Sequence, residues 1–288
     1  MSPLRQRFLD DLRLRNYSPR TREAYVAGVA RLARHYGRSP DRLGPEEVRA
    51  FLLSLVERGV SWSLFNQTVC ALKLFYTVTL QRADVVTYVA YGKRAKTLPV
   101  VLAPEEVVQL FTAARPGVER VLLQTDYALG LRVSELVRLQ VPDLDSRRMV
   151  VRVHAGKGRK DRLVPLSPKL LEELRAYWRA YRPTTWLFPG KKPGTHRSAA
   201  SVQRLVQRVA RRAGLTKAIT VHTLRHSYAT HQLEAGLDLL TLQRVLGHQS
   251  LKTTAEYVHL TTRQLQRTPG LLEWLARPLP EPLPEGLA

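Results

Sequence analysis

The sequence predicts a mainly α-helical protein of two domains with one small β-hairpin, which is an α+β fold. Apolar residues recur at helical spacing along most of the 288 residues. Two strand-like runs flank a glycine-rich turn near the middle of the chain, which is the pattern of a hairpin. The length is about twice that of a typical single domain. Because strand signals are confined to the second part, we expect an all-helical first domain and a mixed second domain.

The first domain is predicted over residues 1–88 as a bundle of helices. Leu4, Phe8 and Leu12 fall at helical spacing. Ser18-Pro19 is typical of an N-cap followed by proline at the first helical position, and Gly44-Pro45 marks the start of a third helix that Gly59 stops. Residues 64–80 give a fourth helix. A basic, poorly periodic stretch over 89–103 then predicts an exposed linker.

The second domain is predicted over residues 104–276. Met149–Val153 and Arg162–Leu166 are the two hairpin strands, and Trp186–Phe188 is a candidate third strand. Helices are expected over 104–115, 118–129, 168–181, 199–213, 222–235, 238–246 and 251–258. Prolines at every second position from Pro278 to Pro284 cannot continue a helix, so residues 277–288 are expected to form an extended tail.

The charge balance points to a polyanionic partner. Lys and Arg number 46 against 24 Asp and Glu, which gives a net charge of +22. Residues 1–88 hold 14 of the cations and 8 of the anions, so both predicted domains are basic. We therefore expect double-stranded DNA to be bound from two sides. A single cysteine, Cys70, excludes an internal disulfide and a Cys-rich zinc site. With no apolar run long enough to span a bilayer, we expect no membrane partner and a cytoplasmic, nucleoid-associated protein.

Two segments hold the residues that carry chemistry. In Gly130-Leu131-Arg132-Val133-Ser134-Glu135-Leu136, one helix ends near Gly130 and another begins, which holds Arg132 at the junction. Further along, His222 and Arg225 are three residues apart and project from one helix face. His248 and Tyr257 follow.

A zinc site is the rival interpretation of the histidines, because His222 and His226 lie four residues apart on one helix. The catalytic zinc motif has Glu directly after its first His, where this chain has Thr223. The charge of Arg225 between the two histidines would also repel a dication. We therefore expect no metal ion.

The order of Arg132, Lys157, His222-x-x-Arg225, His248 and Tyr257 resembles the tyrosine recombinase (phage integrase) family, of the Xer-like or integron-integrase-like kind. The resemblance covers about residues 1–276. It implies an all-helical N-terminal DNA-binding domain and a mixed catalytic domain. It also implies a site-specific recombinase that cuts and rejoins duplex DNA through a covalent 3′-phosphotyrosyl intermediate, with no cofactor, metal or ATP.

The resemblance also implies a role for each residue. Tyr257 would be the nucleophile. Arg132 and Arg225 would stabilise the charge on the phosphate oxygens, because guanidinium forks match them in geometry, and His248 would add a donor. His222 would either accept the tyrosine proton or donate to the phosphate. Lys157 would protonate the leaving oxygen, and Glu135 would support the arginines. Arg159 and Lys160 lie so close to Lys157 that either could take its place.

Other functions and partners follow from the same residues. The alternatives are a topoisomerase of the type IB kind and a DNA-binding protein without catalysis. The resemblance implies a homotetramer on two DNA sites, with a second, paired recombinase as a further candidate subunit. Asn66 and Gln67 are candidates for reading adenine edges in the major groove. The candidates for phosphate contacts are Lys93, Arg94, Lys96, Arg159 and Lys160.

Overall fold

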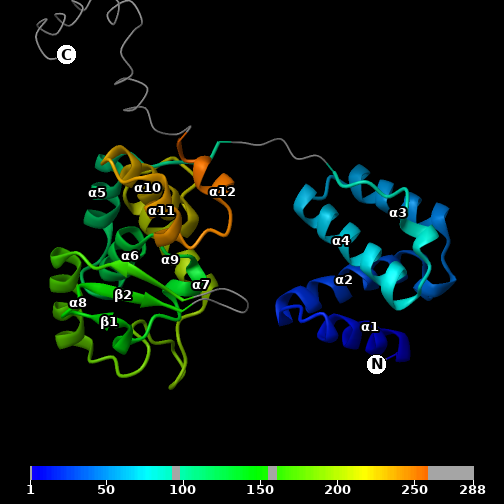
Figure 1. Ribbon diagram of the computed structural model, residues 1–288, viewed down its shortest axis with the longest axis horizontal. Helices are drawn as coiled ribbons and strands as arrows, with labels where there is room; N and C mark the ends of the chain where they lie inside the picture. Colours follow the sequence, from blue (N-terminus) through cyan, green and yellow to red (C-terminus); the bar gives the residue numbers. More distant parts are fainter. Residues whose placement is uncertain (1, 93–97, 155–160, 259–288) are drawn as a thin grey trace, which may run out of the picture. The chain divides into compact units, whose positions relative to one another are not determined.

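A computed structural model describes residues 2–92, 98–154 and 161–258. The chain divides into two compact units, Met1–Thr97 and Leu98–Ala288 (Figure 1). Each unit has its own hydrophobic core. The mainly helical fold class with a small sheet is confirmed. Within the described residues, no helix combines the length and apolarity that crossing a membrane requires.

Four helices build the first unit, and prolines and serines set where they begin. They are α1 (Pro3–Leu14), α2 (Pro19–Tyr36), α3 (Pro45–Glu57) and α4 (Trp62–Leu74). The side chains of Ser2, Ser18 and Ser61 each accept a hydrogen bond from a backbone N–H of the first turn, which satisfies one donor that the helix leaves unpaired. The fourth predicted helix, 64–80, ends earlier than expected, because the backbone widens into a π-helix over Phe75–Thr79.

The expected linker over 89–103 is packed at both of its described ends. Val89 is buried in the core of the first unit, and Leu102 is buried in the core of the second. The backbone N–H of Leu102 also donates to Ser227 Oγ at 2.9 Å. Among the described residues of the stretch, Ala90, Tyr91, Leu98, Val100 and Ala103 are exposed. Residues 93–97, with Lys93, Arg94 and Lys96, lie outside the described part of the chain.

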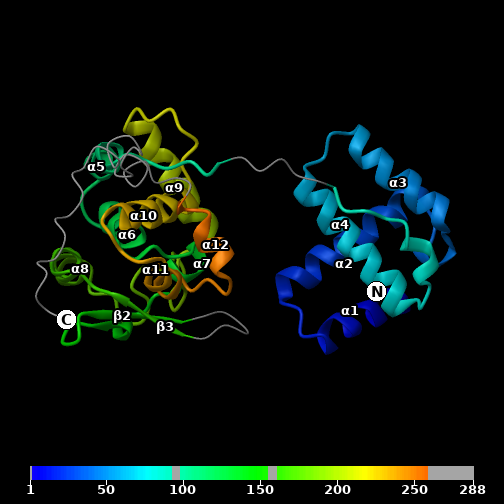
Figure 2. The same cartoon turned by 45° about the horizontal axis from the view of Figure 1, so that its top comes forward.

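Helices make up most of the second unit. They are α5 (Pro104–Ala113), α6 (Val118–Leu129), α7 (Val133–Leu136), α8 (Pro168–Tyr181), α9 (Ala199–Arg212), α10 (Val221–Glu234), α11 (Leu239–Leu246) and α12 (Leu251–Ala255). α10 packs against α6, α9 and α11, and α11 also contacts strand β3 (Arg162–Pro165). Figure 2 shows α10 and α11 lying close to α7 and α12, so the segments that carry the chemistry meet in one region.

A three-stranded antiparallel sheet completes the unit, in the order β1 (Leu144–Asp145), β2 (Val150–Val153), β3. The predicted hairpin is confirmed, with Val151 opposite Val164 in the register. The third strand was predicted wrongly. Trp186 makes only an isolated bridge to Gln140, because 185–187 pairs with the loop at 139–141, whereas β1 adds to the sheet instead. The turn with Lys157, Arg159 and Lys160 lies outside the described residues.

Candidate active site

Two helices end at glycines that face the same place. α6 ends at Gly130 with φ 55°, and α11 ends at Gly247 with φ 64°. Both values are in the left-handed region, which glycine tolerates best, and a Cβ at Gly130 would lie 2.4 Å from the ring of Tyr228. The last carbonyls of a helix have no partner within it and carry the negative end of its dipole. The two ends therefore present unpaired acceptors to cationic side chains.

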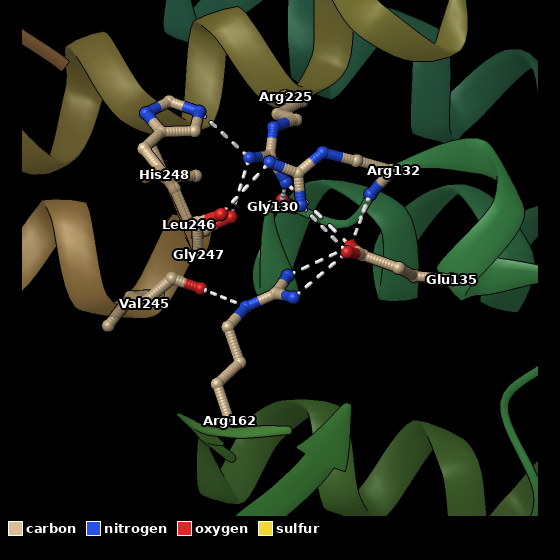
Figure 3. Close-up of polar contacts among 9 residues, drawn as sticks. All are labelled: Gly130, Arg132, Glu135, Arg162, Arg225, Val245, Leu246, Gly247 and His248. Atoms are coloured by element: carbon tan, nitrogen blue, oxygen red, sulfur yellow. Dashed lines mark hydrogen bonds and ion pairs between the residues drawn. The ribbon is translucent and has the colours of Figure 1, made fainter. Parts of the chain in front are cut away.

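Three arginines from different elements donate hydrogen bonds to these carbonyls. Arg225, on α10, donates to the carbonyl of Gly130 at 2.6 Å and to that of Leu246 at 2.7 Å. Arg132, the residue before α7, donates to the carbonyl of Gly247 at 3.1 Å. Arg162, at the start of β3, donates through Nε to the carbonyl of Val245 (Figure 3). We call Arg132, Arg162 and Arg225 the arginine cluster.

Glu135 is the acidic partner of the arginine cluster. Its carboxylate accepts both terminal nitrogens of Arg162, at 2.9 and 2.8 Å, and Nη1 of Arg132 at 2.8 Å, while Nη1 of Arg225 lies 3.8 Å away. Burial alone would raise the pKa of Glu135. The hydrogen bonds and charges of Arg162 and Arg132 outweigh burial and bring that pKa to about 2. Glu135 is therefore a carboxylate at neutral pH.

The arginine cluster keeps a positive charge after this pairing. Three guanidinium groups against one carboxylate leave a net charge of +2. Burial, followed by the charge of Arg132, lowers the pKa of Arg225 only to about 10, so this side chain stays charged at neutral pH. The side chain of Arg132 is 21% exposed, against 9% for Arg162 and 4% for Arg225. Arg132 is thus the member most accessible to an incoming anion.

His248 joins the arginine cluster through its ring. Nε2 lies 3.0 Å from Nη2 of Arg225, and Nδ1 lies 2.9 Å from Oγ1 of Thr254. Because a guanidinium can only donate, Nε2 is the acceptor and Nδ1 carries the hydrogen that is donated to Thr254. Burial and the charge of Arg225 lower the pKa of His248 to about 4, so its imidazole is neutral at pH 7.

The side chain of Tyr257 lies between two imidazoles. Its hydroxyl is 3.1 Å from Nδ1 of His226, and its ring is stacked on that of His248 at a centroid distance of 6.1 Å. Tyr257 is only 4% exposed. Burial raises the pKa of Tyr257, and the nearby charge of Arg225 offsets part of that effect. The phenol is therefore protonated at neutral pH.

The structure brings five of the predicted site residues together, namely Arg132, Glu135, Arg225, His248 and Tyr257. His222 lies one turn before His226 on α10 and is exposed, with its ring centroid 6.1 Å from that of His226. In the first unit, Asn66 exchanges hydrogen bonds with the backbone of Gly92 at 3.0 and 2.8 Å, which fixes the end of that unit, whereas Gln67 is exposed.

Sequence reasoning missed two residues of the site. Arg162 shares the inward strand face of Val164, since the intervening Leu163 is exposed, and a cation on a core face needs a buried partner. That alternation is a signal that the sequence contains. His226 was considered only as a zinc ligand. Its contact with Tyr257 spans 31 residues, and no local pattern indicates it. Among the described residues, no cluster of three or more His, Cys, Asp or Glu is arranged to hold a metal ion.

Family models match both units of the chain. Residues 100–264 match the phage integrase family, and residues 4–84 match the N-terminal SAM-like domain of phage integrases. The chain belongs to the phage integrase family. This confirms the resemblance on which the interpretation of Arg132, Arg225 and Tyr257 rests.

Relatives match over nearly the full length. Protein y4qK of Sinorhizobium fredii is 43% identical and covers 99% of this chain and 93% of its own. Tyrosine recombinase XerC of Pelotomaculum thermopropionicum is 33% identical, covering 90% of this chain and 94% of its own. The crystal structure of XerA recombinase is 26% identical with a TM-score of 0.55, covering 96% and 98%. A lambda integrase dimer bound to a COC′ core site has a TM-score of 0.74 at 18% identity, covering 93% and 78%, and supports the fold.

Proposed function

We propose that this protein is a site-specific DNA recombinase that cuts and rejoins duplex DNA through a 3′-phosphotyrosyl linkage to Tyr257. The observation that carries the proposal is that Tyr257 lies beside Arg225 of the arginine cluster and stacks on His248, which accepts a hydrogen bond from Arg225. Family membership supports the reaction class, and the geometry supports the assignment of residues.

The cleavage step uses the cluster as a phosphate clamp. Oη of Tyr257 attacks the phosphorus, a new O–P bond forms, and the bond from phosphorus to the 5′ oxygen breaks. Negative charge grows on the non-bridging oxygens, and the net charge of +2 on the arginine cluster stabilises it. Arg132 reaches the phosphate most directly because it is the most exposed member. Arg225 completes the clamp, and His248 holds the Arg225 guanidinium in place by accepting its hydrogen bond. His222 lies on the same helix as Arg225 and is a further candidate donor.

The leaving oxygen needs a proton, because a free alkoxide is a strong base. We assign this proton to Lys157 on the β2–β3 turn, with Arg159 and Lys160 as its neighbours in sequence. In the reverse step the 5′ hydroxyl attacks the phosphotyrosine and restores the backbone. The covalent linkage conserves the bond energy, so rejoining needs no ATP or other cofactor. We also propose that no metal ion takes part, because the arginine cluster supplies the positive charge.

The first unit and the oligomer belong to the same proposal. Residues 1–88 would bind DNA beside the catalytic domain at 104–276, with 89–103 connecting them and Gln67 free to reach bases. Strand exchange requires cuts at two sites, which favours a tetramer, either of this chain alone or with a paired second recombinase. A protein that acts on chromosomal or plasmid DNA would work in the cytoplasm, at the nucleoid. The relatives named above are recombinases and integrases, which favours this reading over a topoisomerase.

The test is covalent trapping in cells. Protein–DNA adducts are captured under denaturing conditions, and the attached DNA is sequenced to give the site. Wild-type protein should yield adducts at defined sequences, and Tyr257→Phe should yield none while retaining DNA binding. Tyr127→Phe is the matched control, because it also removes a tyrosine hydroxyl that is hydrogen-bonded to a histidine of α10, in this case His231. Adducts of normal yield from Tyr257→Phe would overturn the proposal.

A further inference from the structure

We propose that His226 is the catalytic residue that takes the hydroxyl proton of Tyr257 as Tyr257 attacks the phosphate. The inference rests on the proposed function and deepens it, because the resemblance leaves this proton either to His222 or to no named group. It makes His226 a second functional histidine of α10.

The geometry selects His226 over its neighbour. Nδ1 of His226 lies 3.1 Å from the Tyr257 hydroxyl, within the range for proton transfer between heavy atoms. The two rings are 5.6 Å apart and tilted by 47°. His222 lies one helical turn away and is exposed to solvent. Of the two histidines, only His226 is therefore in hydrogen-bonding contact with the reacting oxygen. Arg225 also interacts with this hydroxyl, but a guanidinium cannot accept a proton.

His248, the other imidazole beside Tyr257, has no ring nitrogen free to accept the tyrosine proton. Nε2 of His248 accepts from Arg225, and its Nδ1 donates to Thr254. The nearest arginine cannot accept a proton at all. Glu256, the residue before Tyr257, is the acidic group that acts on this site, and its charge favours a protonated His226. Of the groups whose contacts surround the Tyr257 hydroxyl, His226 alone offers a ring nitrogen in contact with it.

The electrostatics keep His226 in its neutral form, and the same effects make it a weaker base than an ordinary histidine. Burial lowers the pKa of His226 to about 4, and the electrostatic effects of His222 and Arg225 add to the lowering. The ring is therefore neutral at pH 7, with a lone pair for the phenol. A bound phosphodiester adds negative charge to the site, which opposes the effect of the cationic neighbours. The transfer then accompanies bond formation, because the tyrosine oxygen loses its basicity as it bonds to phosphorus.

The proton balance of the reaction closes with this assignment. During cleavage, the Tyr257 proton passes to Nδ1 of His226 while Lys157 delivers a different proton to the 5′ oxygen. During rejoining, the 5′ hydroxyl returns its proton to Lys157 as it attacks phosphorus, and the tyrosine oxygen leaves and takes its proton back from the imidazolium. His226 acts on the nucleophile and Lys157 acts on the leaving group. A substrate with an altered leaving group can therefore distinguish the two roles.

Asparagine at position 226 isolates proton transfer from positioning. Its side-chain oxygen accepts a hydrogen bond close to the place of Nδ1 but cannot hold the proton. The substrate is a nicked duplex that contains the DNA site identified by covalent trapping, so that the short segment released by cleavage diffuses away and the adduct accumulates. On this substrate, His226→Asn should form the adduct about 100-fold more slowly than wild type. The defect should persist when sulfur replaces the 5′ oxygen, whereas that of Lys157→Ala should be relieved. His231→Asn, which alters the Tyr127–His231 pair of the same helix, should react normally.

A second measurement needs no DNA. Nitrogen-15 chemical shifts of the full-length protein report which ring nitrogen of His226 carries hydrogen. We expect Nδ1 to be unprotonated and hydrogen-bonded in wild type, with a shift that changes in Tyr257→Phe. If His226→Asn fails to fold, His226→Gln serves in its place, and this measurement still tests the proposal on the wild-type chain.

The outcomes separate the two proposals. A normal rate of adduct formation by His226→Asn, or relief of its defect by the 5′-sulfur substrate, would overturn the role of His226 and leave the recombinase intact. A hydrogen on Nδ1 of His226 in wild type would do the same. Adducts formed by Tyr257→Phe would instead overturn the proposed function itself.

Discussion

At the centre of the site, Glu135 holds three guanidinium groups within reach of one another. Without it, the like charges of Arg132, Arg162 and Arg225 would repel each other in a buried space. The carboxylate thus preorganises the clamp before any phosphate enters, which is the arrangement that stabilises a transition state at least cost.

Glu135 also links stability to pH. The pKa of Glu135 is about 2 in the folded protein against 4.5 as the ordinary value, so the carboxylate contributes stability above the ordinary pKa and loses it as pH falls through the folded one. The contribution is about 3 kcal/mol, at about 1.4 kcal/mol for each pKa unit. Glu135→Gln should lower the free energy of unfolding by about 3 kcal/mol at neutral pH. In denaturant unfolding experiments, this difference between wild type and Glu135→Gln should become smaller as pH falls from about 5 to about 2. A difference that is independent of pH would contradict the account.

Arg162 should matter through its forked geometry. Arg162→Lys keeps the charge but loses the paired contacts with Glu135, so the free energy of unfolding should fall by about 1–3 kcal/mol and adduct formation should slow. The matched control is Arg152→Lys on the exposed face of β2, which should change neither quantity. Equal effects of the two variants would mean that the fork is not required.

At the scale of residues, the sequence indicates what its local patterns encode. The junction at Gly130 and the spacing of His222 and Arg225 are local, so the positions of Arg132 and Arg225 could be predicted. The contact of His226 with Tyr257 and the pairing of Arg162 with Glu135 depend on how α10, α12 and β3 pack. Such contacts require the tertiary structure.

Among the elements, the β2–β3 hairpin matters most, because it carries Lys157. The base of the hairpin is fixed by His154, whose Nε2 lies 2.7 Å from Asp143 and whose Nδ1 lies 3.2 Å from Asp161 on the facing strand end. The hydrogen bond to Asp143, followed by the charges of Asp143 and Asp161, raises the pKa of His154 against the opposing effect of burial. When it is protonated, the imidazolium ties both acids to one side chain.

The raised pKa of His154 predicts the pH range in which its contacts with Asp143 and Asp161 stabilise the protein. A raised folded pKa gives stability that is fully present below the ordinary histidine pKa and is lost as pH rises through the folded value. His154→Gln should therefore reduce the free energy of unfolding most at about pH 5–6 and least near about pH 9. His196→Gln, which removes a half-buried imidazole that packs on Trp186, is the matched control. A larger loss at high pH than at low pH would contradict this account.

Helices and strands could be predicted where capping residues or a periodic apolar pattern indicates them. Proline and serine at the helix starts allowed most helices to be placed within a few residues. Trp186–Phe188 was mistaken for a strand, because an apolar run does not reveal which backbone it pairs with. β1 has only two residues, too few for any periodicity.

For the whole molecule, the division of charge between the two units is the main physical feature. Both units are basic, so both should neutralise phosphates. The logarithm of the DNA association constant should fall with the logarithm of salt concentration by about 0.9 per phosphate neutralised. The slope of the full chain should be steeper than that of residues 98–288 alone, because Met1–Thr97 forms its own compact unit. Equal slopes would mean that the first unit does not contact the DNA backbone.

The two-domain organisation was predictable because the strand signal appears only in the second part and each part has its own apolar pattern. The division between Thr97 and Leu98 lies within the linker predicted at 89–103, although Val89 at its start still packs into the first core. Where packing continues past the last periodic residue, sequence patterns underestimate the extent of a domain.

The most direct test of the central claim is to identify the residue that carries the DNA. Adducts trapped from wild-type protein are digested with nuclease and protease, and the remaining peptides are sequenced by mass spectrometry. The account predicts a nucleotide joined through its 3′ phosphate to Tyr257, in the peptide that contains Leu251–Val258. A nucleotide attached to another residue, or joined through a 5′ phosphate, would contradict it.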